Sequence, residues 1–582
     1  MTALAPEDHQ SWQSERPAPI SQPRLRVGVV VDGLVTAAWV AFVIGSVRAS
    51  DDLELVVVAV EHRAAFDVRG GSKHKLHWSS VLWQVYSQLD YRAYRKRVQR
   101  DALASIDIRS LCASVPVRDL STLQNAAREA RITSLDVLLD LRTGPGRVRV
   151  PNVASFGTWY LRPWDTLEQA SDAPSFWEIN EHRTVCAATI EAVRVNEARL
   201  LYRSFSATDF SSVYKNTNRA YCKLADMAVR KLEALSRHGW ELVTTFLPDS
   251  GPRDSQHIHP VPDNLCMLRF LWRWIVRGLG RRAREALFRR DWLLAVRQRN
   301  WVHLGEWTGR GFRLVETPSD RFYADPMIFG IENGPRYLFF EDFRYKDDKA
   351  VISCAELGQA GELGPSTTVL ERDYHLSYPF VFAHQGQIYM LPESSQHRTL
   401  ELYRAVAFPY RWVLHSVVME GLRITDATLF QHDGRFWLFA TIGAEGASDW
   451  DDLHLFSSCS PLHGWIPHPL NPVVSDVRRA RPAGRLFHDR GDIIRPSQDS
   501  ATMYGHAIVL NRIDVLSETE YHETPVGRIS PAWLPGLVGT HTLAWEDGVE
   551  VLDGRKWVTR PLPRLLRVPT PRSRARGGAR GS

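Results

Sequence analysis

Side chains that transfer protons or bind anions recur in five polar clusters between residues 322 and 542, each directly before an apolar strand. Carboxylates and imidazoles exchange protons with a bound ligand, and guanidinium groups pair with phosphates or carboxylates through two hydrogen bonds. If the clusters meet in space, they form one site with acid, base and anion-binding groups. The side chains concerned are Asp325, His375, Tyr378, Asp426, Arg481 and His541.

The elements that must bring these clusters together follow a repeat of roughly 50 to 60 residues. Each repeat contains an apolar strand, a turn such as His432-Asp433-Gly434 and a second strand rich in aromatic residues. Short strands and turns at this spacing are typical of a β-propeller, in which small antiparallel sheets pack around a central channel. We predict five blades over residues 300–556. If each cluster opens an innermost strand, all five lie at one mouth of the channel.

The part of the chain before the repeats has a different pattern. Continuous apolar runs at 25–31, 53–60 and 135–141 are separated by longer stretches, the first of which is compatible with a helix. Strands that are apolar throughout are typical of a parallel sheet covered on both faces. We therefore predict a multidomain chain, with a Rossmann-like α/β domain at 25–235 followed by the all-β propeller.

Residues 236–299 join the two predicted domains. A polar, Pro-containing linker is followed by a helix in which arginines alternate with tryptophans and leucines. Such a segment, at 265–299, can lie on a membrane surface, where guanidinium groups meet anionic lipid and indoles sit at the headgroups. The alternative is an interdomain helix that packs its apolar face on the propeller. The ends of the chain, 1–24 and the Arg-, Pro- and Gly-rich 557–582, are predicted to be disordered.

The composition limits the classes of function. The 582 residues carry a net charge of +6, and 44% are hydrophobic, which indicates a globular protein and gives no support to nucleic-acid binding. Six cysteines lie far apart without a C-x-x-C pair, so neither zinc nor a disulfide framework is favoured, and no metal site is predicted. Without a segment of signal-peptide or membrane-spanning type, we expect a cytoplasmic protein, peripheral at the inner membrane face if the helix binds lipid.

A first resemblance concerns residues 25 to 235. Gly157-Thr158-Trp159 and Phe176-Trp177-Glu178 are similar to segments of a divergent formyltransferase-like domain of bacterial polysaccharide proteins. Formyltransferases use an Asn, a His and an Asp to move a formyl group from a folate to an amine. The stretch from Tyr160 to Asp165, where such domains carry histidines, has none, so folate is disfavoured. Candidates for ligand binding or catalysis at the carboxyl end of this sheet are Asp165, Trp177 and Glu178, with a structural role as the alternative.

A second resemblance covers residues 300 to 550. Nine segments, among them Ala324-Asp325-Pro326, Phe339-Phe340-Glu341-Asp342 and Asp426-Ala427-Thr428, are similar in order to a particular propeller family. The family is named for the N-terminal domain of plant glucosamine inositolphosphorylceramide transferase, and it occurs in bacterial proteins beside a formyltransferase-like domain. In the plant protein a separate glycosyltransferase domain follows, of a type that we do not find in these 582 residues.

More distantly, the propeller resembles five-bladed glycosidases of the arabinanase and invertase type. This resemblance implies Asp325, Glu393 and Asp426 as catalytic carboxylates, since one carboxylate stabilises or attacks the sugar centre while another protonates the departing oxygen. The structural alternative is that such residues cap turns or pin blades, as an Arg495–Asp499 pair would. Predicted substrate-binding residues are Asp342, His375, Tyr378, Arg481, Arg495, Gln498, Asp499, Tyr504 and His541.

The predicted function is a glycosyltransferase-type enzyme of polysaccharide or glycolipid biosynthesis, with its active site in the propeller channel. Its substrate would be a sugar or a glycolipid; a nucleotide sugar is the donor class that this chemistry suggests, and no cofactor is certain. Three alternatives stay open: a carbohydrate-binding propeller that assists a partner glycosyltransferase, formyl or acyl transfer to an amino sugar by the N-terminal domain, and a propeller glycoside hydrolase. The donor, acceptor, linkage and oligomeric state are not encoded in any motif we recognise.

Overall fold

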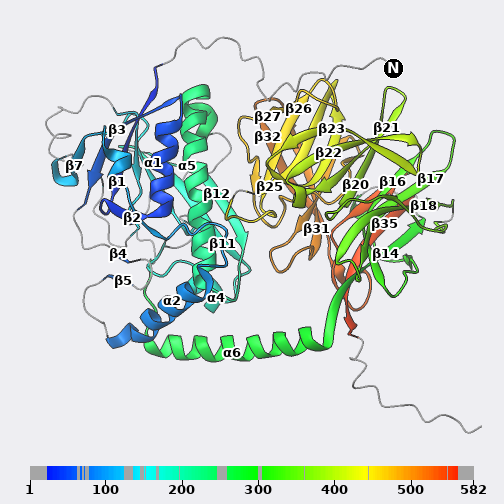
Figure 1. Cartoon of the computed structure of the whole chain (residues 1–582), viewed down its shortest axis with the longest axis horizontal. Coiled ribbons are helices and arrows are strands. Elements are labelled where there is room, and N and C mark those ends of the chain that lie inside the picture. Colours follow the sequence, from blue (N-terminus) through cyan, green and yellow to red (C-terminus); the bar gives the residue numbers. More distant parts are fainter. Residues whose placement is uncertain are drawn as a thin grey trace, which may run out of the picture. The chain divides into compact units, whose positions relative to one another are not determined.

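The computed structural model divides into two compact units, shown in Figure 1. One contains the residues up to Asn264 together with 444–448, and the other contains the remaining residues from Leu265 onward. Most of the predicted N-terminal lead, part of the linker and the tail beyond residue 560 lie outside the described residues. These are 23–61, 66–67, 71–72, 78–122, 135–143, 150, 153–165, 170–195, 197–244, 258–298, 304–359, 361–443, 445–546 and 548–560.

The first unit is built on a seven-stranded sheet in the order β12-β11-β9-β8-β1-β3-β7. Strands β9, β8, β1, β3 and β7 are parallel neighbours, whereas β11 and β12 form an antiparallel edge. The parallel sheet expected from the apolar runs is confirmed, and the antiparallel edge makes it a mixed sheet. The strands are β1 (Leu25–Val31), β3 (Leu53–Val60), β7 (Val117–Asp119), β8 (Val137–Asp140), β9 (Thr158–Arg162), β11 (Val185–Val193) and β12 (Ala198–Ala207).

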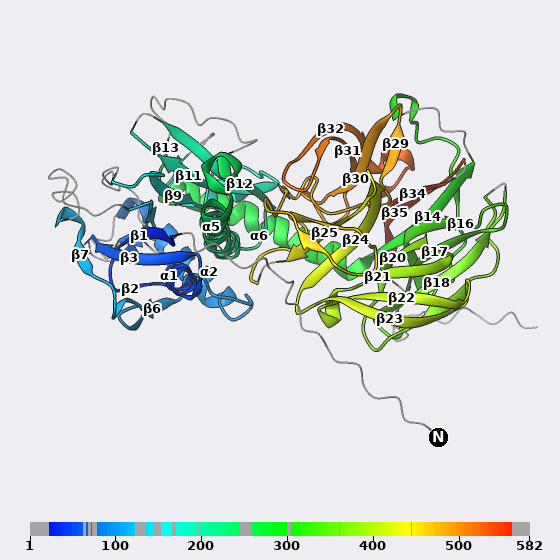
Figure 2. The ribbon, with the colours of Figure 1, turned by 90° about the horizontal axis from the view of Figure 1, so that it is seen from above.

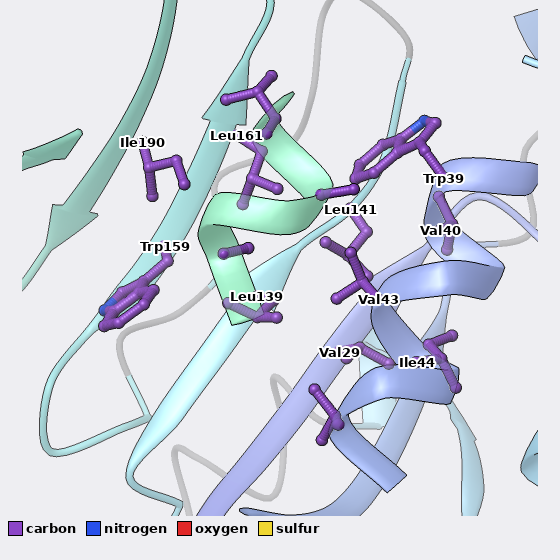
Figure 3. Close-up of a cluster of buried hydrophobic side chains, with 14 of the residues drawn as sticks. Val29, Trp39, Val40, Val43, Ile44, Leu139, Leu141, Trp159, Leu161 and Ile190 are labelled. Atoms are coloured by element: carbon purple, nitrogen blue, oxygen red, sulfur yellow. The ribbon is translucent and has the colours of Figure 1, made fainter. Parts of the chain in front are cut away.

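Helices α1 (Ala38–Ala49) and α5 (Val213–Thr244) lie side by side in this unit (Figure 1). Trp39 of α1 stacks on Tyr221 of α5, with ring centroids 5.0 Å apart. Burying an aliphatic side chain of this core contributes roughly 1.5 to 3 kcal/mol, so this layer holds the sheet in place. Figure 3 shows part of this buried cluster: Trp39, Val40, Val43 and Ile44 belong to α1, and the other labelled side chains, which come from the strands or directly follow one, are Val29, Leu139, Leu141, Trp159, Leu161 and Ile190.

Smaller elements complete the first unit. Helix α5 is interrupted at Gly239, whose φ is +82°. The others are α2 (Val81–Tyr94), α4 (Phe176–Asn180) and the strand pairs β2 (Val35–Ala37) with β6 (Ser105–Asp107), β4 (Phe66–Asp67) with β5 (Gly71–Ser72), and β10 (Ala170–Ser171) with β13 (Ile258–His259).

The second unit is a five-bladed β-propeller, as predicted (Figure 2). Each blade is an antiparallel sheet; the polar cluster lies wholly or partly within the first strand in blades 1 to 3 and precedes the first strand of blade 4 and strand β34 of blade 5. Blade 1 contains β16 (Arg321–Gly330), β17 (Arg336–Arg344), β18 (Lys349–Leu357) and β19 (Thr367–Leu370); blade 2 contains β20 (Ser377–His384), β21 (Gln387–Ser394), β22 (Thr399–Ala407) and β23 (Arg411–Glu420).

The remaining blades have shorter or additional strands. Blade 3 contains β24 (Arg423–His432), β25 (Arg435–Gly443), β26 (Asp452–Ser458), β27 (Ile466–Pro467) and β28 (Val474–Ser475). Blade 4 contains β29 (Phe487–Asp489), β30 (Asp492–Asp499), β31 (Ala507–Leu516) and β32 (Tyr521–Ile529). Blade 5 contains β34 (Leu543–Glu546), β35 (Val549–Thr559), β33 (Leu537–Gly539), β14 (Phe288–Gln298) and β15 (Arg313–Leu314).

The closure of blade 5 corrects the predicted domain boundaries. Residues 288–298 were expected to belong to the linker and its basic helix, but the helix ends at Leu287 and these residues form strand β14; the propeller was expected to end at 556, but β35 continues to Thr559. Strand β14 pairs with β35 along its whole length, from Phe288 opposite Thr559 to Gln298 opposite Val549. The two ends of the propeller segment therefore share one sheet, which closes the ring of blades and removes two open edges.

A bulge recurs at the start of three consecutive blades. Asp325, Tyr378 and Asp426 each have a φ between +45° and +52° and each precede a shift in the pairing register. A left-handed residue of this kind re-aims its side chain, and it is costly for a side chain as large as Tyr378. Strained backbone of this type gathers at functional sites. The recurrence explains why the cluster residues share one place in each blade.

The backbone at Gly484, in the fourth cluster, lies against the backbone of Leu543 in blade 5, and a substitution can test this contact. The φ of Gly484 is +125°, and a Cβ at this position would lie 2.0 Å from the carbonyl oxygen of Leu543. We expect Gly484→Ala to lower the free energy of unfolding by at least about 2 kcal/mol in urea denaturation. Gly434→Ala, at a turn with φ +73° and no atom within 4 Å, is the control and should lose about 1 kcal/mol. Equal losses would contradict the close contact.

No helix among the described residues is long and apolar enough to cross a membrane.

Candidate functional site

A buried ion triad lies at the start of blades 1 and 5. His541 places Nε2 3.5 Å from Oδ1 of Asp325, and its Nδ1 pairs with Asp553 of strand β35. Asp325 also accepts hydrogen bonds from the Thr542 hydroxyl at 2.8 Å and from the Tyr378 backbone N–H at 3.3 Å. Burial lowers the pKa of His541, but the two aspartates outweigh it, and the net pKa is raised. The raised pKa favours a protonated imidazole between these two acids.

A second ionic group joins blades 2, 3 and 4. The Arg481 guanidinium donates to both oxygens of Asp426, at 2.5 and 3.1 Å, and to Glu393 at 3.2 Å. Gln498 donates a further hydrogen bond to Asp426 at 2.8 Å. Burial and the neighbouring Glu393 charge raise the pKa of Asp426 to about 7, against the lowering effect of Arg481. One cation thus holds two carboxylates that come from different blades.

Glu341, on strand β17, adds another carboxyl group to this cluster. Burial, followed by the negative charges of Asp325 and Glu393, raises its pKa well above the ordinary value. His375 places Nε2 3.5 Å from Glu341, and its Nδ1 accepts a hydrogen bond from the Ala350 backbone N–H. The proton of the neutral imidazole is therefore on Nε2, which faces Glu341, and burial lowers the pKa of His375.

The carboxylates form two layers that differ in exposure. The side chains of Glu341 and Glu393 are each 10% exposed, whereas those of Asp325, Asp426 and Asp553 are between 0% and 5% exposed. The two glutamates are therefore slightly more accessible than the three aspartates, and we refer to them as the outer and the inner layer. So many acids with few cations stay buried only at considerable free-energy cost.

Aromatic rings lie beside the ionic groups. Trp292 of strand β14 stacks on the His541 imidazole, with centroids 3.8 Å apart and planes 11° apart. Tyr504 lies under the Arg481 guanidinium at 5.0 Å, and Trp450 lies 5.4 Å from Tyr504. Tyr504 and Trp450 are half-buried. Partly exposed rings beside carboxylates are the usual surroundings of sugar rings, which present apolar faces and hydroxyl edges.

Several predicted substrate-binding residues have other partners. Arg495 is fully buried and donates to both oxygens of Glu523 at 2.8 Å, while Asp499 accepts from Arg528 at 2.6 Å. The structural pair Arg495–Asp499 that the sequence suggested is therefore wrong. Asp342 accepts from Arg321 and from Ser353. These three residues do not contact the two ionic groups described above, so we leave them out of the proposed site.

Tyr378 is brought into the cluster, but as a buried support. Its hydroxyl accepts the Gly484 backbone N–H at 2.8 Å and shares a hydrogen bond of 2.8 Å with the Thr428 hydroxyl. These contacts use the polar atom that a ligand would need. Among the predicted residues, the structure does bring together Asp325, Glu393, Asp426, His375, Arg481, Gln498, Tyr504 and His541.

The N-terminal candidates are engaged in contacts within their own unit. Asp165 follows β9 and accepts two hydrogen bonds from Arg203, at 2.5 and 3.1 Å. The Trp177 indole donates to the Pro260 carbonyl and stacks on His259. Glu178 is half-buried in α4, and its charge, after burial, is the next cause that raises the pKa of Cys186. The structure does not test whether these residues do chemistry, and that stays a prediction.

Sequence reasoning missed four residues of the site. Glu341 belongs to a segment that the family resemblance already includes, but its neighbour Asp342 was predicted as the substrate-binding residue. Asp553 interrupts the apolar run of the last strand, and an acid in such a run is a signal that could have been used. Trp292 and Trp450 lie outside the five clusters and have no local signal.

Asp325, His541 and Asp553 offer ligand atoms within 4.8 Å of one another, a geometry that can hold a metal ion. However, a metal needs a neutral imidazole with a free nitrogen. Here Nδ1 pairs with Asp553 and the raised pKa favours the protonated ring. A metal ion bound here would therefore have to displace the proton that the raised pKa of His541 favours.

The comparisons with known proteins place the propeller beside a plant family. Residues 312–530 match the family model described as Glucosamine inositolphosphorylceramide transferase 1, N-terminal. Proteins named Glucosamine inositolphosphorylceramide transferase 1 from Oryza sativa subsp. japonica and Arabidopsis thaliana are both 37% identical over 215 and 214 residues. Each alignment covers 35% of this chain, but only 28% of the rice protein and 27% of the Arabidopsis protein.

These relatives are plant proteins, so the expected bacterial context is not supported by them. Apart from residues 444–448, the family match lies in the second unit, and the formyltransferase-like identity of the first unit is not confirmed and stays a prediction.

Solved structures with similar folds are glycosidases. A family 117 glycoside hydrolase of Zobellia galactanivorans aligns with 10% identity and a TM-score of 0.31, over 46% of this chain and 91% of the other. An α-L-arabinofuranosidase from Clostridium thermocellum aligns with 12% identity and a TM-score of 0.26, over 36% of this chain and 74% of the other. At these scores the likeness carries no argument about the site.

Proposed function

We propose that the propeller is a glycosyl-transferring domain that acts on a sugar or glycolipid at the cluster of Glu341 and Glu393. The observation that carries the proposal is the two-layer arrangement: two outer glutamates on adjacent blades, above three buried aspartates and one arginine. Glycosyl chemistry needs one carboxyl group to protonate a departing oxygen and another to stabilise the positive charge that develops on the sugar. The 37% identity to plant proteins named as transferases supports transfer of the sugar to an acceptor, in preference to hydrolysis.

The two glutamates have environments that suit different roles. The raised pKa of Glu341 favours its protonated form, as a general acid requires, and His375 lies within reach to renew its proton. Glu393 accepts a hydrogen bond from the Arg481 guanidinium at 3.2 Å, and we assign it the role of stabilising the charge that develops on the sugar. Asp325 and Asp426 act through these groups as positioning residues, because their oxygens are already bonded within the protein.

The names of the relatives indicate a substrate class. We propose a nucleotide-linked hexosamine as donor and an inositolphosphorylceramide-like lipid as acceptor, and a cytoplasmic reaction. Because the matched segment is an N-terminal part covering 28% of the rice protein, a second function has specific support. In that alternative, the propeller binds the sugar and a partner glycosyltransferase carries out the transfer.

The test is binding of a panel of nucleotide sugars to the full chain, followed by donor consumption with the lipid acceptor. We expect a thermal shift with a hexosamine donor, and in Glu393→Gln a retained shift with turnover lowered roughly a hundredfold or more. Glu420→Gln, an exposed glutamate at the end of strand β23 in the same blade, is the matched control and should behave as wild type. Binding without turnover in the wild type would favour the binding function, and no shift with any donor would contradict both.

A further inference from the structure

Helix α6 (Asn264–Leu287), which precedes the first strand of the propeller, has two distinct apolar faces. Met267 and Phe270 lie on one face and are buried. The other face consists of side chains that are between 47% and 69% exposed, and they recur at the three- and four-residue spacing that aligns side chains along a helix. We call this face the apolar stripe: Leu265, Leu268, Trp272, Ile275 and Leu279.

The charge of α6 is of one sign over most of its length. Arg269, Arg273, Arg277 and Arg281 recur every four residues, so they form a row along the helix, and all four are exposed. The only acidic residue in the helix is Glu285, in its last turn. Among the described residues, no ion pair involves Arg269, Arg273 or Arg277. The row therefore carries uncompensated positive charge beside the apolar stripe.

We infer that α6 docks the protein on an anionic lipid surface, with the apolar stripe in the headgroup boundary and the arginine row against lipid phosphates. Helices that lie in a membrane interface combine an apolar face with Trp and Leu and a polar face rich in Lys and Arg. A helix face that only contacts solvent usually carries both positive and negative side chains. A row of arginines without acidic neighbours is instead complementary to the negative charge of anionic lipid. This inference rests on α6 alone and does not depend on the proposed transfer reaction.

The apolar stripe and the arginine row should contribute to membrane binding in ways that respond differently to salt. The stripe supplies apolar area that does not depend on salt, while attraction of the arginines to the membrane falls off within a Debye length and weakens as salt is added. Because Met267 and Phe270 make the contacts on the other face, substitutions in the stripe and in the row should leave the fold intact. The protein's melting temperature provides the check on this point.

The experiment is co-sedimentation of the full chain with vesicles of phosphatidylcholine, with or without about one third phosphatidylserine. We expect binding to the anionic vesicles at least tenfold tighter than to the neutral ones, and weaker at higher salt. Trp272→Glu should lower it at least tenfold. The triple variant Arg269→Gln, Arg273→Gln and Arg277→Gln should lower it about a hundredfold, from about 1 kcal/mol for each arginine.

Matched controls change similar residues elsewhere. Val195→Glu alters an apolar side chain that is 80% exposed between β11 and β12 in the first unit, and the triple variant Arg92→Gln, Lys96→Gln and Arg118→Gln removes three exposed charges there. Both should bind vesicles as wild type does. The inference is overturned if wild type binds neither composition, if the controls lose as much as the α6 variants, or if α6 proves to be covered by a second copy. That last outcome would appear in light scattering as a dimer that Trp272→Glu dissociates.

Discussion

Replacing Glu341 by Gln is expected to abolish turnover and, at the same time, to stabilise the protein at neutral pH. The substitution keeps the shape of the side chain but removes its proton and its capacity for charge. If Glu341 is the general acid, turnover should fall roughly a hundredfold to ten-thousandfold while the sugar donor still binds. The panel of donors described above supplies the binding measurement, and donor consumption supplies the rate.

The stability change follows from the pKa of the same group. The pKa of Glu341 is raised in the folded protein, by burial and then by Asp325 and Glu393, above its unfolded value of about 4.5. Its contribution to stability is therefore complete below that pH and is lost as the pH rises through the folded value. The glutamine of the Glu341→Gln variant does not titrate and suffers no such loss. The two proteins should unfold at the same urea concentration near pH 4, and the variant should be more stable at pH 8 by more than about 1 kcal/mol.

Two comparisons make this result specific. Glu356→Gln changes an exposed glutamate on strand β18 of the same blade, and it should alter neither turnover nor the pH dependence of stability. Asp426, with a pKa of about 7, also titrates in this range and its charge contributes to the raised pKa of Glu341, so the difference between wild type and variant reports Glu341 together with its interaction with Asp426. If Glu341→Gln keeps full turnover, Glu341 is not the acid. If the variant is more stable than wild type by the same amount at pH 4 and at pH 8, the surroundings of Glu341 do not raise its pKa.

The architecture was largely predictable because its signals are local. Turn residues such as His432-Asp433-Gly434 and an apolar strand in each repeat were sufficient to predict five blades, and the apolar runs from Leu25 and Leu53 were sufficient for the parallel sheet. What could not be predicted is the partner of the last strand. Strand β14 pairs with β35 because the two ends of the propeller segment meet when the ring of blades closes. No local feature of residues 288–298 shows that they belong to the last blade and not to the linker.

The site was harder because side-chain direction depends on register. Glu341 and Asp342 are adjacent, so only one of them can face the cluster, and the pairing places Glu341 opposite Ala324 and Asp342 opposite Tyr323. The bulge at Asp325 adds one residue to the inner strand, so counting alternate residues across it gives the wrong face. For the same reason, the identity of the residues in each cluster was predictable, whereas their partners on the neighbouring strands were not.

Replacing Arg495 by Met is expected to destabilise the protein strongly without weakening sugar binding by the remaining folded fraction. Arg495 is fully buried, and it donates to both oxygens of Glu523 and to the carbonyl oxygens of Arg479 and Ala480. Without Arg495, the buried Glu523 charge keeps only the longer contact with Arg479, at 3.7 Å. Breaking a buried ion pair in this way costs about 3 to 5 kcal/mol. Urea denaturation measures the loss, and donor binding below the transition measures the site.

We expect much of this loss to come from the Glu523 charge that Arg495→Met leaves behind. Adding Glu523→Leu to Arg495→Met removes the stranded charge and should recover about half of the stability, because a well-packed apolar pair often replaces a buried ion pair. Recovery stays incomplete because the Tyr521 hydroxyl also donates to Glu523, at 2.6 Å, and loses its acceptor. Arg512→Met, which breaks the exposed pair with Asp514 in the same blade, should lose no more than about 1 kcal/mol. A small loss in Arg495→Met together with weakened donor binding would instead return Arg495 to the ligand site.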